Sequence, residues 1–325
     1  MKDHYELVIL GGGPAGLSAG LYAARARLDH VLIEKGAPGG QVLLTDWVDN
    51  YPGFPDGLTG FDLVDKMTRH AKKFDLNIEL ASVVKVDPNG GKCKILHLEG
   101  GRQLTCDTLI LCTGASANTL KVPGEIELRG KGVSYCGTCD APFYRNMHVA
   151  VIGGGNTAIQ EADYLTKFAS KVTVIHRRAE LRATKIIQEI AFANKKIEFL
   201  WNTTVTSIEG ENEVQYLNLL AKDGTKSTFD VEGVFVLIGV TPNNAGLPLD
   251  LLRVDKWGFI PIDGESQTAI PGIMAAGDIC SKEVRQIVNA VGEGAVAVLT
   301  AERYLITLKE NKKADDEAVQ KLPCQ

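Results

Sequence analysis

The sequence has no long hydrophobic run and no excess of positive charge. A helix that spans a bilayer needs roughly 18 apolar residues, whereas the first apolar run, residues 7–10, ends at glycines, so we expect no signal peptide. The net charge of −5 at pH 7 argues against a general affinity for nucleic acid or anionic lipid. These absences predict a cytoplasmic protein with no membrane or nucleic-acid partner.

Cysteine is scarce and unevenly spaced. Seven cysteines in 325 residues are too few for the disulfide scaffold of a small secreted protein. Only Cys136 and Cys139 are close in sequence, which in a reducing compartment favours redox chemistry or a metal site. A closed zinc site needs four ligands, and the sequence has no second C-x-x-C or C-x-x-H, so we expect no metal. We expect small core side chains at Cys93, Cys106, Cys112 and Cys280 and an exposed bystander at Cys324.

A strand–loop–helix–strand pattern begins near the N-terminus. An apolar strand at residues 5–10 enters the glycine loop 11–16, a helical pattern rich in alanine and leucine covers 17–27, and a second strand ends at Glu34. This order is a βαβ unit with a G-x-G-x-x-G loop, the context in which that loop binds a dinucleotide.

The same pattern occurs a second time. A strand at residues 148–152 enters the glycine loop 153–158, a helical pattern covers 159–168, and the next strand, 171–175, ends at His176. The chain is long enough for two domains, and two copies of a nucleotide-binding domain are the simplest account of the repeat.

The C-terminal segment begins no third copy. It has a helical pattern at residues 287–305, and after Leu308 it is polar and charged, so we expect that tail to fray. If this segment completes the first copy, the second copy is an insertion, which surface loops tolerate. The predicted fold is α/β with two Rossmann-like three-layer domains, the second inserted into the first. The first domain takes residues 1–116 and 245–325, and the second takes 117–244.

The first glycine loop favours a dinucleotide without a 2′-phosphate. Gly11 is expected to make the tight turn, Gly13 to let the backbone approach a pyrophosphate, and Gly16 to let the helix pack on the sheet. The helix N-terminus then offers N–H groups to the phosphates. Glu34 can accept hydrogen bonds from ribose hydroxyls, and its carboxylate would repel a 2′-phosphate. FAD or NAD(H) suits this loop, and the turn Gly277-Asp278 favours FAD.

The second glycine loop favours NADPH. An acid is missing at the strand end, where His176, Arg177 and Arg178 stand, with Arg182 one turn on. Arginine suits bidentate contact with phosphate, so this site should prefer NADPH over NADH. The alternative is a solvated basic patch at a strand end.

Cys136 and Cys139 are the most reactive pair that the sequence offers. Two intervening residues let the sulfurs form a small-loop disulfide, and C-x-x-C motifs lower one thiol pKa so that a thiolate is available for exchange. Asp140 follows directly and can donate and accept the protons of the thiols.

Taken together, these motifs resemble the low-molecular-weight thioredoxin reductases over nearly the whole chain. The placement of C-x-x-C-D just before the second glycine loop is typical of that family, because glutathione-reductase-like enzymes carry their cysteines in the FAD domain. The resemblance rests on residues 11–16, 39–41, 136–140, 153–158, 176–178, 275–278 and 285–286.

The motifs and the resemblance together imply site residues. Cys139 would face the flavin, and Cys136 would attack the disulfide of thioredoxin. Asp140 would donate and accept the protons of the thiols. The expected FAD residues are Gly11, Gly13, Pro14, Ala15, Gly16, Glu34, Gly39, Gly40, Gln41, Asn50, Thr113, Gly114, Gly277, Asp278, Arg285 and Gln286. The expected NADPH residues are Gly153, Gly155, Asn156, Thr157, Ala158, His176, Arg177, Arg178 and Arg182.

The resemblance also implies an assembly and a motion. Members are homodimers, and they rotate the NADPH domain between two states, which predicts hinges near Ala117 and Asn244. Two departures are visible: Gln160 stands where many members have glutamate, and Ala141-Pro142 replaces a glycine-containing pair. Neither changes a redox atom, although Gln160 alters the expected nicotinamide side.

Three other functions remain open at this point. A flavin subunit of an alkyl-hydroperoxide reductase usually has an N-terminal disulfide domain, whereas here the flavin motif begins at Gly11. An NADH- or ferredoxin-dependent reductase of another small disulfide protein usually lacks the basic cluster. A flavin-binding redox sensor without turnover would not need both the cysteine pair and the second loop.

Overall fold

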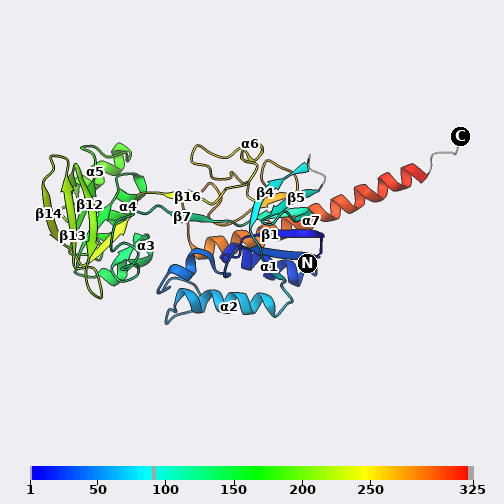
Figure 1. Ribbon diagram of the computed structural model, residues 1–325, viewed down its shortest axis with the longest axis horizontal. Helices are drawn as coiled ribbons and strands as arrows, with labels where there is room; N and C mark the ends of the chain where they lie inside the picture. The colour runs from blue at the N-terminus through cyan, green and yellow to red at the C-terminus, as the bar shows by residue number, and fades with distance from the viewer. Residues whose placement is uncertain (1, 90–92, 321–325) are drawn as a thin grey trace. The chain divides into compact units, whose positions relative to one another are not determined.

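The computed structural model describes residues 2–89 and 93–320, with side chains up to residue 311 (Figure 1). The chain divides into two compact units. One runs to Ser116 and resumes at Pro242, and the other is Ala117–Thr241. The second unit therefore ends three residues before the boundary expected at residue 244. Both units are built on parallel sheets, which confirms the predicted α/β class.

The sheet of the first unit carries its glycine loop at the end of a central strand. The strand order is β3-β2-β1-β6-β5-β4, with β17 also paired to β6. β1, β2, β3, β6 and β17 are parallel, and β4 and β5 form an antiparallel extension. The bounds are β1 (His4–Leu10), β2 (His30–Glu34), β3 (Ile78–Leu80), β4 (Val83–Asp87), β5 (Lys94–Leu98), β6 (Gln103–Leu111) and β17 (Ile273–Ala275).

Helices bury the apolar faces of this sheet. α1 (Pro14–Arg25) begins with Pro14 at its first turn, where proline fits a helix, and packs its alanines against α7 (Ile287–Gln320). α2 (Gly60–Lys72) is capped by Thr59, whose side chain accepts a hydrogen bond from the Asp62 amide at 3.0 Å. This unit also contains the 3-10 helix η1 (Gly40–Leu44) and the short helix α6 (Leu249–Leu252).

α7 is longer than the sequence predicts. The apolar pattern ends near Leu305 and the tail was expected to fray, but the helix continues to Gln320. Lysine, glutamate and alanine in the tail favour helix without needing an apolar face. No helix within the described ranges is long and apolar enough to cross a membrane.

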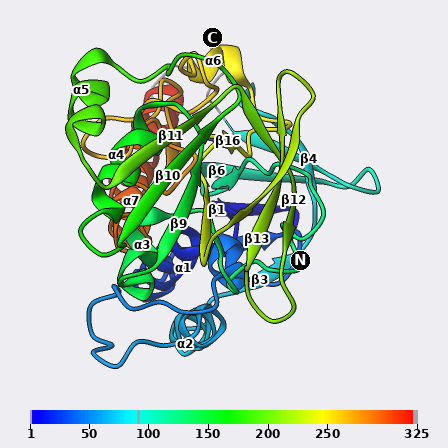
Figure 2. The ribbon, with the colours of Figure 1, turned by 90° about the vertical axis from the view of Figure 1, so that its left-hand side faces the viewer.

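The second unit repeats the parallel arrangement in a smaller sheet. Its order is β11-β10-β9-β15-β8, with all pairs parallel, and β9, β10 and β11 run side by side with α4 and α5 to their left in Figure 2. A separate antiparallel sheet follows. The bounds are β8 (Val133–Ser134), α3 (Gly137–Asp140), η3 (Ala141–Tyr144), β9 (His148–Ile152), α4 (Asn156–Leu165), β10 (Lys171–His176), α5 (Lys185–Ala193), β11 (Ile197–Trp201), β12 (Thr203–Glu209), β13 (Tyr216–Ala221), β14 (Lys226–Asp230) and β15 (Gly233–Val236).

The chain enters and leaves the second unit through two paired strands, β7 (Ala115–Ala117) and β16 (Val240–Pro242). Side-chain hydrogen bonds join the two ends of this β7–β16 ribbon. Ser116 Oγ donates to Asn243 Oδ1 at 3.0 Å, and Thr241 Oγ1 donates to Asn118 Oδ1 at 2.7 Å. The hinges expected near Ala117 and Asn244 fall in or beside this ribbon.

Three of the single cysteines are core residues, as predicted. Cys106, Cys112 and Cys280 are buried and unpaired, and burial raises the pKa of the Cys280 thiol to about 12, so it stays protonated. The prediction is wrong for Cys93, which is only half-buried at the start of β5, where Asn89 reaches its sulfur. Cys324 lies outside the described residues.

Candidate functional site

The first glycine loop has the geometry that its residue types require. Gly11 has φ +108°, and a Cβ there would collide with the carbonyl of Cys112. A Cβ on Gly16 would collide with the carbonyl of Gly11, so α1 packs directly on the turn. Gly13 differs, because the nearest atom to its Cβ position is 4.0 Å away. No side chain caps α1, so its first N–H groups are available to an anion at the open side of the loop.

The Glu34 carboxylate is fixed against this loop. Its Oε2 accepts the Gly12 N–H at 2.6 Å, and its Oε1 accepts the Gly36 N–H at 3.0 Å. Gly39 donates to the Gly12 carbonyl at 2.7 Å, which brings Gly40 beside Gly13. The predicted residues 11–16, 34 and 39–40 therefore meet at one edge of the sheet.

Three predicted FAD residues each have a buried polar atom with no hydrogen-bond partner: Thr113 Oγ1, Asp278 Oδ1 and Arg285 Nε. Burial also raises the pKa of Asp278, against the lowering effect of Lys282 and Arg285. Buried polar groups are almost always hydrogen-bonded, and exceptions point to a missing ion, water or ligand. FAD, with its hydroxyl and phosphate oxygens, fits these orphaned groups. Another predicted pair, Asn50 and Gln286, joins side chain to side chain at 3.3 Å.

Two residues that the sequence analysis missed hold the turn at Gly277. Glu293 on α7 accepts the Gly277 N–H at 2.7 Å, and both of its oxygens accept from Lys282 Nζ, at 2.9 and 2.7 Å. Lys282 Nζ also lies 3.8 Å from Asp278. In the sequence, the one sign of this role is that Glu293 is a charged residue among the small apolar residues of the helix.

The second glycine loop is open in the same place. Nothing lies within 4 Å of the Cβ position of Gly155, whereas a Cβ on Gly153 would meet Ala158 and the carbonyl of Leu237. No side chain caps α4. Asn156 accepts the Thr184 amide at 2.9 Å, so the loop is tied to the segment that enters α5.

The basic cluster splits into two parts. Arg177, Arg178 and Arg182 are exposed, as a phosphate-binding group needs to be. His176 is only 6% exposed, and its ring lies against Gly154 with Nε2 at 3.1 Å from the Glu180 carbonyl. Burial lowers the pKa of His176, so at neutral pH it supports the loop as an uncharged ring.

Cys136 and Cys139 form a disulfide at the start of α3. The Cys139 N–H donates to Cys136 Sγ at 3.2 Å. Ser134 Oγ donates to the Asp140 carboxylate at 2.6 Å and accepts the Cys136 N–H at 3.0 Å, which fixes the acid beside the pair. A further carboxylate, Glu161 on α4, accepts the Gly137 N–H, and the sequence analysis did not identify it.

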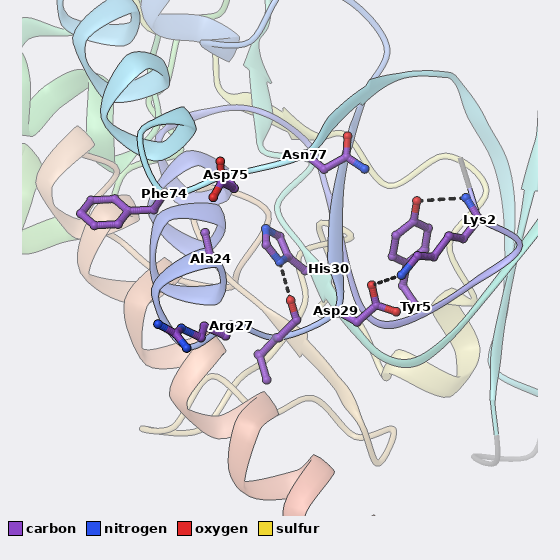
Figure 3. Close-up of a pocket in the computed structure, with 10 residues that line it drawn as sticks. Lys2, Tyr5, Ala24, Arg27, Asp29, His30, Phe74, Asp75 and Asn77 are labelled. Carbon is purple, nitrogen blue, oxygen red and sulfur yellow. Dashed lines mark hydrogen bonds and ion pairs between the residues drawn. The ribbon is translucent and has the colours of Figure 1, made fainter.

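A surface pocket of about 680 Å³ lies away from these groups (Figure 3). It is beside the N-terminal ends of β1 and β2, whereas the first glycine loop follows the C-terminal end of β1. Lys2 pairs with Asp29 across it at 2.8 Å, and His30 Nδ1 is bonded to the Leu28 carbonyl at 2.7 Å. Its lining contains no predicted site residue.

Comparison with known proteins defines the class. Residues 5–294 match the family of pyridine nucleotide-disulphide oxidoreductases, and the chain belongs to that family. Within it, the chain is 42% identical to a thioredoxin reductase of Listeria monocytogenes, over 96% of this chain and 97% of that one. It is 44% identical to one from Peptoclostridium litorale, over 94% and 98%. The crystal structure of thioredoxin reductase from Streptococcus pyogenes matches with a TM-score of 0.89 at 42% identity, covering 94% of this chain and all of that one. The resemblance inferred from the motifs is confirmed.

Proposed function

We propose that this chain is a thioredoxin-disulfide reductase, with NADPH as electron donor, FAD as bound cofactor and Cys136–Cys139 as the redox group of the protein itself. The observation that carries the proposal is the disulfide at the start of α3, in the same unit as a glycine loop followed by exposed arginines. The other unit supplies a loop whose strand ends in a carboxylate.

The first unit suits FAD, which when bound supplies two-electron exchange between NADPH and the disulfide. The N–H groups at the start of α1 and the open side of Gly13 suit its pyrophosphate. Glu34 suits its ribose, and Thr113, Asp278 and Arg285 offer partners for its polar groups.

The second unit suits NADPH, because its exposed arginines lie where the 2′-phosphate of the nucleotide would lie. The open side of Gly155 leaves room for the pyrophosphate. His176 supports the loop from below and adds no charge.

Thiol exchange follows from the hydrogen bonds around the Cys136–Cys139 pair. The Cys139 N–H that points at Cys136 Sγ would stabilise a thiolate there, so Cys136 is the nucleophile. It attacks one sulfur of thioredoxin and forms a mixed disulfide, and the other thioredoxin sulfur leaves as a thiolate. Cys139 then attacks Cys136, which restores the internal disulfide and releases reduced thioredoxin. Asp140 holds and returns the protons.

The protein acts in the cytoplasm as a homodimer, with its hinges at β7 and β16. Exposed apolar side chains on α7 and α1 support the dimer, because a subunit interface would remove them from water. They are Val288, Val296, Leu299 and Tyr22, each at least 37% exposed.

Purified protein should be yellow, contain about one FAD per chain, and oxidise NADPH in the presence of thioredoxin and dithionitrobenzoate. Thioredoxins from the same cell should be tested against a thioredoxin whose cysteines are replaced by serine. A folded protein that cannot be reconstituted with FAD, or one that reduces no thioredoxin, would contradict the proposal.

A further inference from the structure

The disulfide loop is held by a carboxylate outside the C-x-x-C-D motif. Gly137 N donates to Glu161 Oε2 at 2.5 Å, and this amide lies between the two cysteines. A Cβ on Gly137 would lie 2.7 Å from the same oxygen and 3.1 Å from Glu161 Cβ. The missing side chain at position 137 therefore lets the carboxylate approach the loop closely.

Glu161 is placed by the helix that begins at the second glycine loop. It lies on α4, which packs on α3, and Gly137 itself is buried. Burial raises the pKa of Glu161, the Gly137 N–H opposes that rise, and the nearby Asp140 adds to it. Tyr144 follows in η3, where burial and Asp140 raise the pKa of its hydroxyl. The loop thus has two carboxylates beside it and no neighbouring cation among the groups that shift the pKa of Glu161.

The backbone N–H groups of Cys139 and Gly137 have acceptors with opposite effects on the thiols. The Cys139 N–H points at Cys136 Sγ and favours a thiolate, whereas the Gly137 N–H is taken by a carboxylate. A negative charge near a thiol disfavours its ionised form. A dithiol whose thiolate is stabilised is a weaker reductant, because its reduced form is then the stable one. A carboxylate at Gly137 has the reverse effect.

We propose that Glu161 is a positioning residue of the redox pair, which fixes the Cys136–Cys139 loop on α4 and keeps the reduced pair a stronger electron donor than it would be beside a neutral side chain. The exchange itself is balanced within the pair and its substrate. The two thiols give two electrons and two protons to a disulfide, and they become a disulfide in turn. The inference rests on the proposed function only in requiring that the pair be redox-active.

The test is the equilibrium of the pair with a reference dithiol, measured on FAD-loaded protein without NADPH or thioredoxin. Protein is equilibrated in dithiothreitol buffers of graded redox ratio, quenched with acid, alkylated and analysed by mass spectrometry. For Glu161→Gln we expect the equilibrium constant to shift about tenfold towards the dithiol, equivalent to about 30 mV. The pH midpoint for alkylation of Cys136 should fall by about one unit.

Two further variants separate charge from fold. Glu189→Gln makes the same chemical change on the exposed face of α5 and should stay within twofold of wild type. Glu161→Asp keeps the charge and should restore most of the wild-type equilibrium. An unchanged equilibrium in Glu161→Gln, a shift in the opposite direction, or an equal shift in Glu189→Gln would overturn the proposal. If the predicted shift is found but the wild-type protein reduces no thioredoxin, the proposed function is contradicted instead.

A measurement on the wild-type protein covers the case in which Glu161→Gln does not fold. Coupling between two groups is reciprocal, so reduction of the pair must perturb the Glu161 carboxyl group. An infrared difference spectrum of oxidised and reduced protein, repeated with ¹³C-labelled glutamate, should contain a glutamate carboxyl band that moves on labelling. A difference spectrum without such a band would overturn the proposal.

Discussion

The two glycine loops both connect a strand to a helix, but the polar side chains around them differ in burial and in hydrogen bonding. Around the first, Thr113, Asp278 and Arg285 each have a buried side-chain atom with no hydrogen-bond partner. Around the second, within the described part of the chain, no buried side-chain atom lacks a partner, and the arginines are exposed. Buried orphans are costly without a ligand, whereas solvated arginines are not. The difference supports our proposal of a resident cofactor in the first unit and an exchanging one in the second.

The largest effect should come from replacing the cysteines, because this separates reduction of the flavin by NADPH from reduction of thioredoxin. Cys139→Ser should bind FAD as the wild type does, and NADPH should still bleach its absorbance, because hydride transfer needs no cysteine. Thioredoxin reduction should fall to background. Anaerobic spectra measure the reduction of the flavin, and the thioredoxin-coupled assay measures the reduction of thioredoxin. Undiminished thioredoxin reduction in this variant or in Cys136→Ser would remove the pair from the mechanism.

A smaller but still severe loss of stability and of bound FAD should follow from replacing a glycine of the first loop with alanine. In Gly16→Ala the new Cβ meets the carbonyl of Gly11, and overpacking against backbone typically costs about 1–3 kcal/mol. We expect lower FAD content and a lower thermal midpoint. In the second loop, Gly155→Ala, at the position equivalent to Gly13, meets open space and should leave stability within about 0.5 kcal/mol while raising KM for NADPH. Equal destabilisation in both loops would contradict the contrast between them.

The arginines test whether the second loop reads the 2′-phosphate. Replacing Arg177 and Arg178 with glutamine should raise KM for NADPH, because each charge-assisted contact contributes about 1.5–3 kcal/mol. KM for NADH, which lacks that phosphate, should change little. Steady-state kinetics with both nucleotides decide the point, and parallel increases would mean that the cluster does not recognise the phosphate.

The smallest effect concerns pH. Burial lowers the pKa of His176 from the ordinary 6.5, so the folded state binds fewer protons than the unfolded state between the lowered pKa and 6.5. Stability is therefore present above pH 6.5 and is lost as pH falls through that window. His148 shares this direction. The drop in thermal midpoint from pH 7.5 to 5.5 should be smaller in His176→Gln than in wild type. An equal drop would mean that His176 is not buried neutral.

Local patterns predicted most of the fold and of the first site. Each βαβ unit is read within about thirty consecutive residues, so Gly11, Glu34 and Gly155 stand where expected. The failures are contacts between distant segments. Glu161 and Glu293 act on amides in other elements, and nothing in their neighbours marks them.

His176 shows a second limit of the sequence. Beside Arg177 and Arg178 it looks like one more cation, but it is the last residue of β10, which is buried from Val172 to His176. Its ring lies against Gly154, while the arginines beyond the strand reach solvent. Charge clusters in sequence do not state which members are buried.

The ribbon of β7 and β16 makes the second unit a detachable module. Its first and last segments are joined side chain to side chain, at Asn118 and Thr241, so the ends of the inserted piece are neighbours. A piece with adjoining ends can be removed from a host fold, or replaced by another with the same spacing, without stretching the host chain. With the electron donor bound in the second unit, as we propose, exchanging this piece would change the donor specificity together with the Cys136–Cys139 pair and leave the first unit as it is.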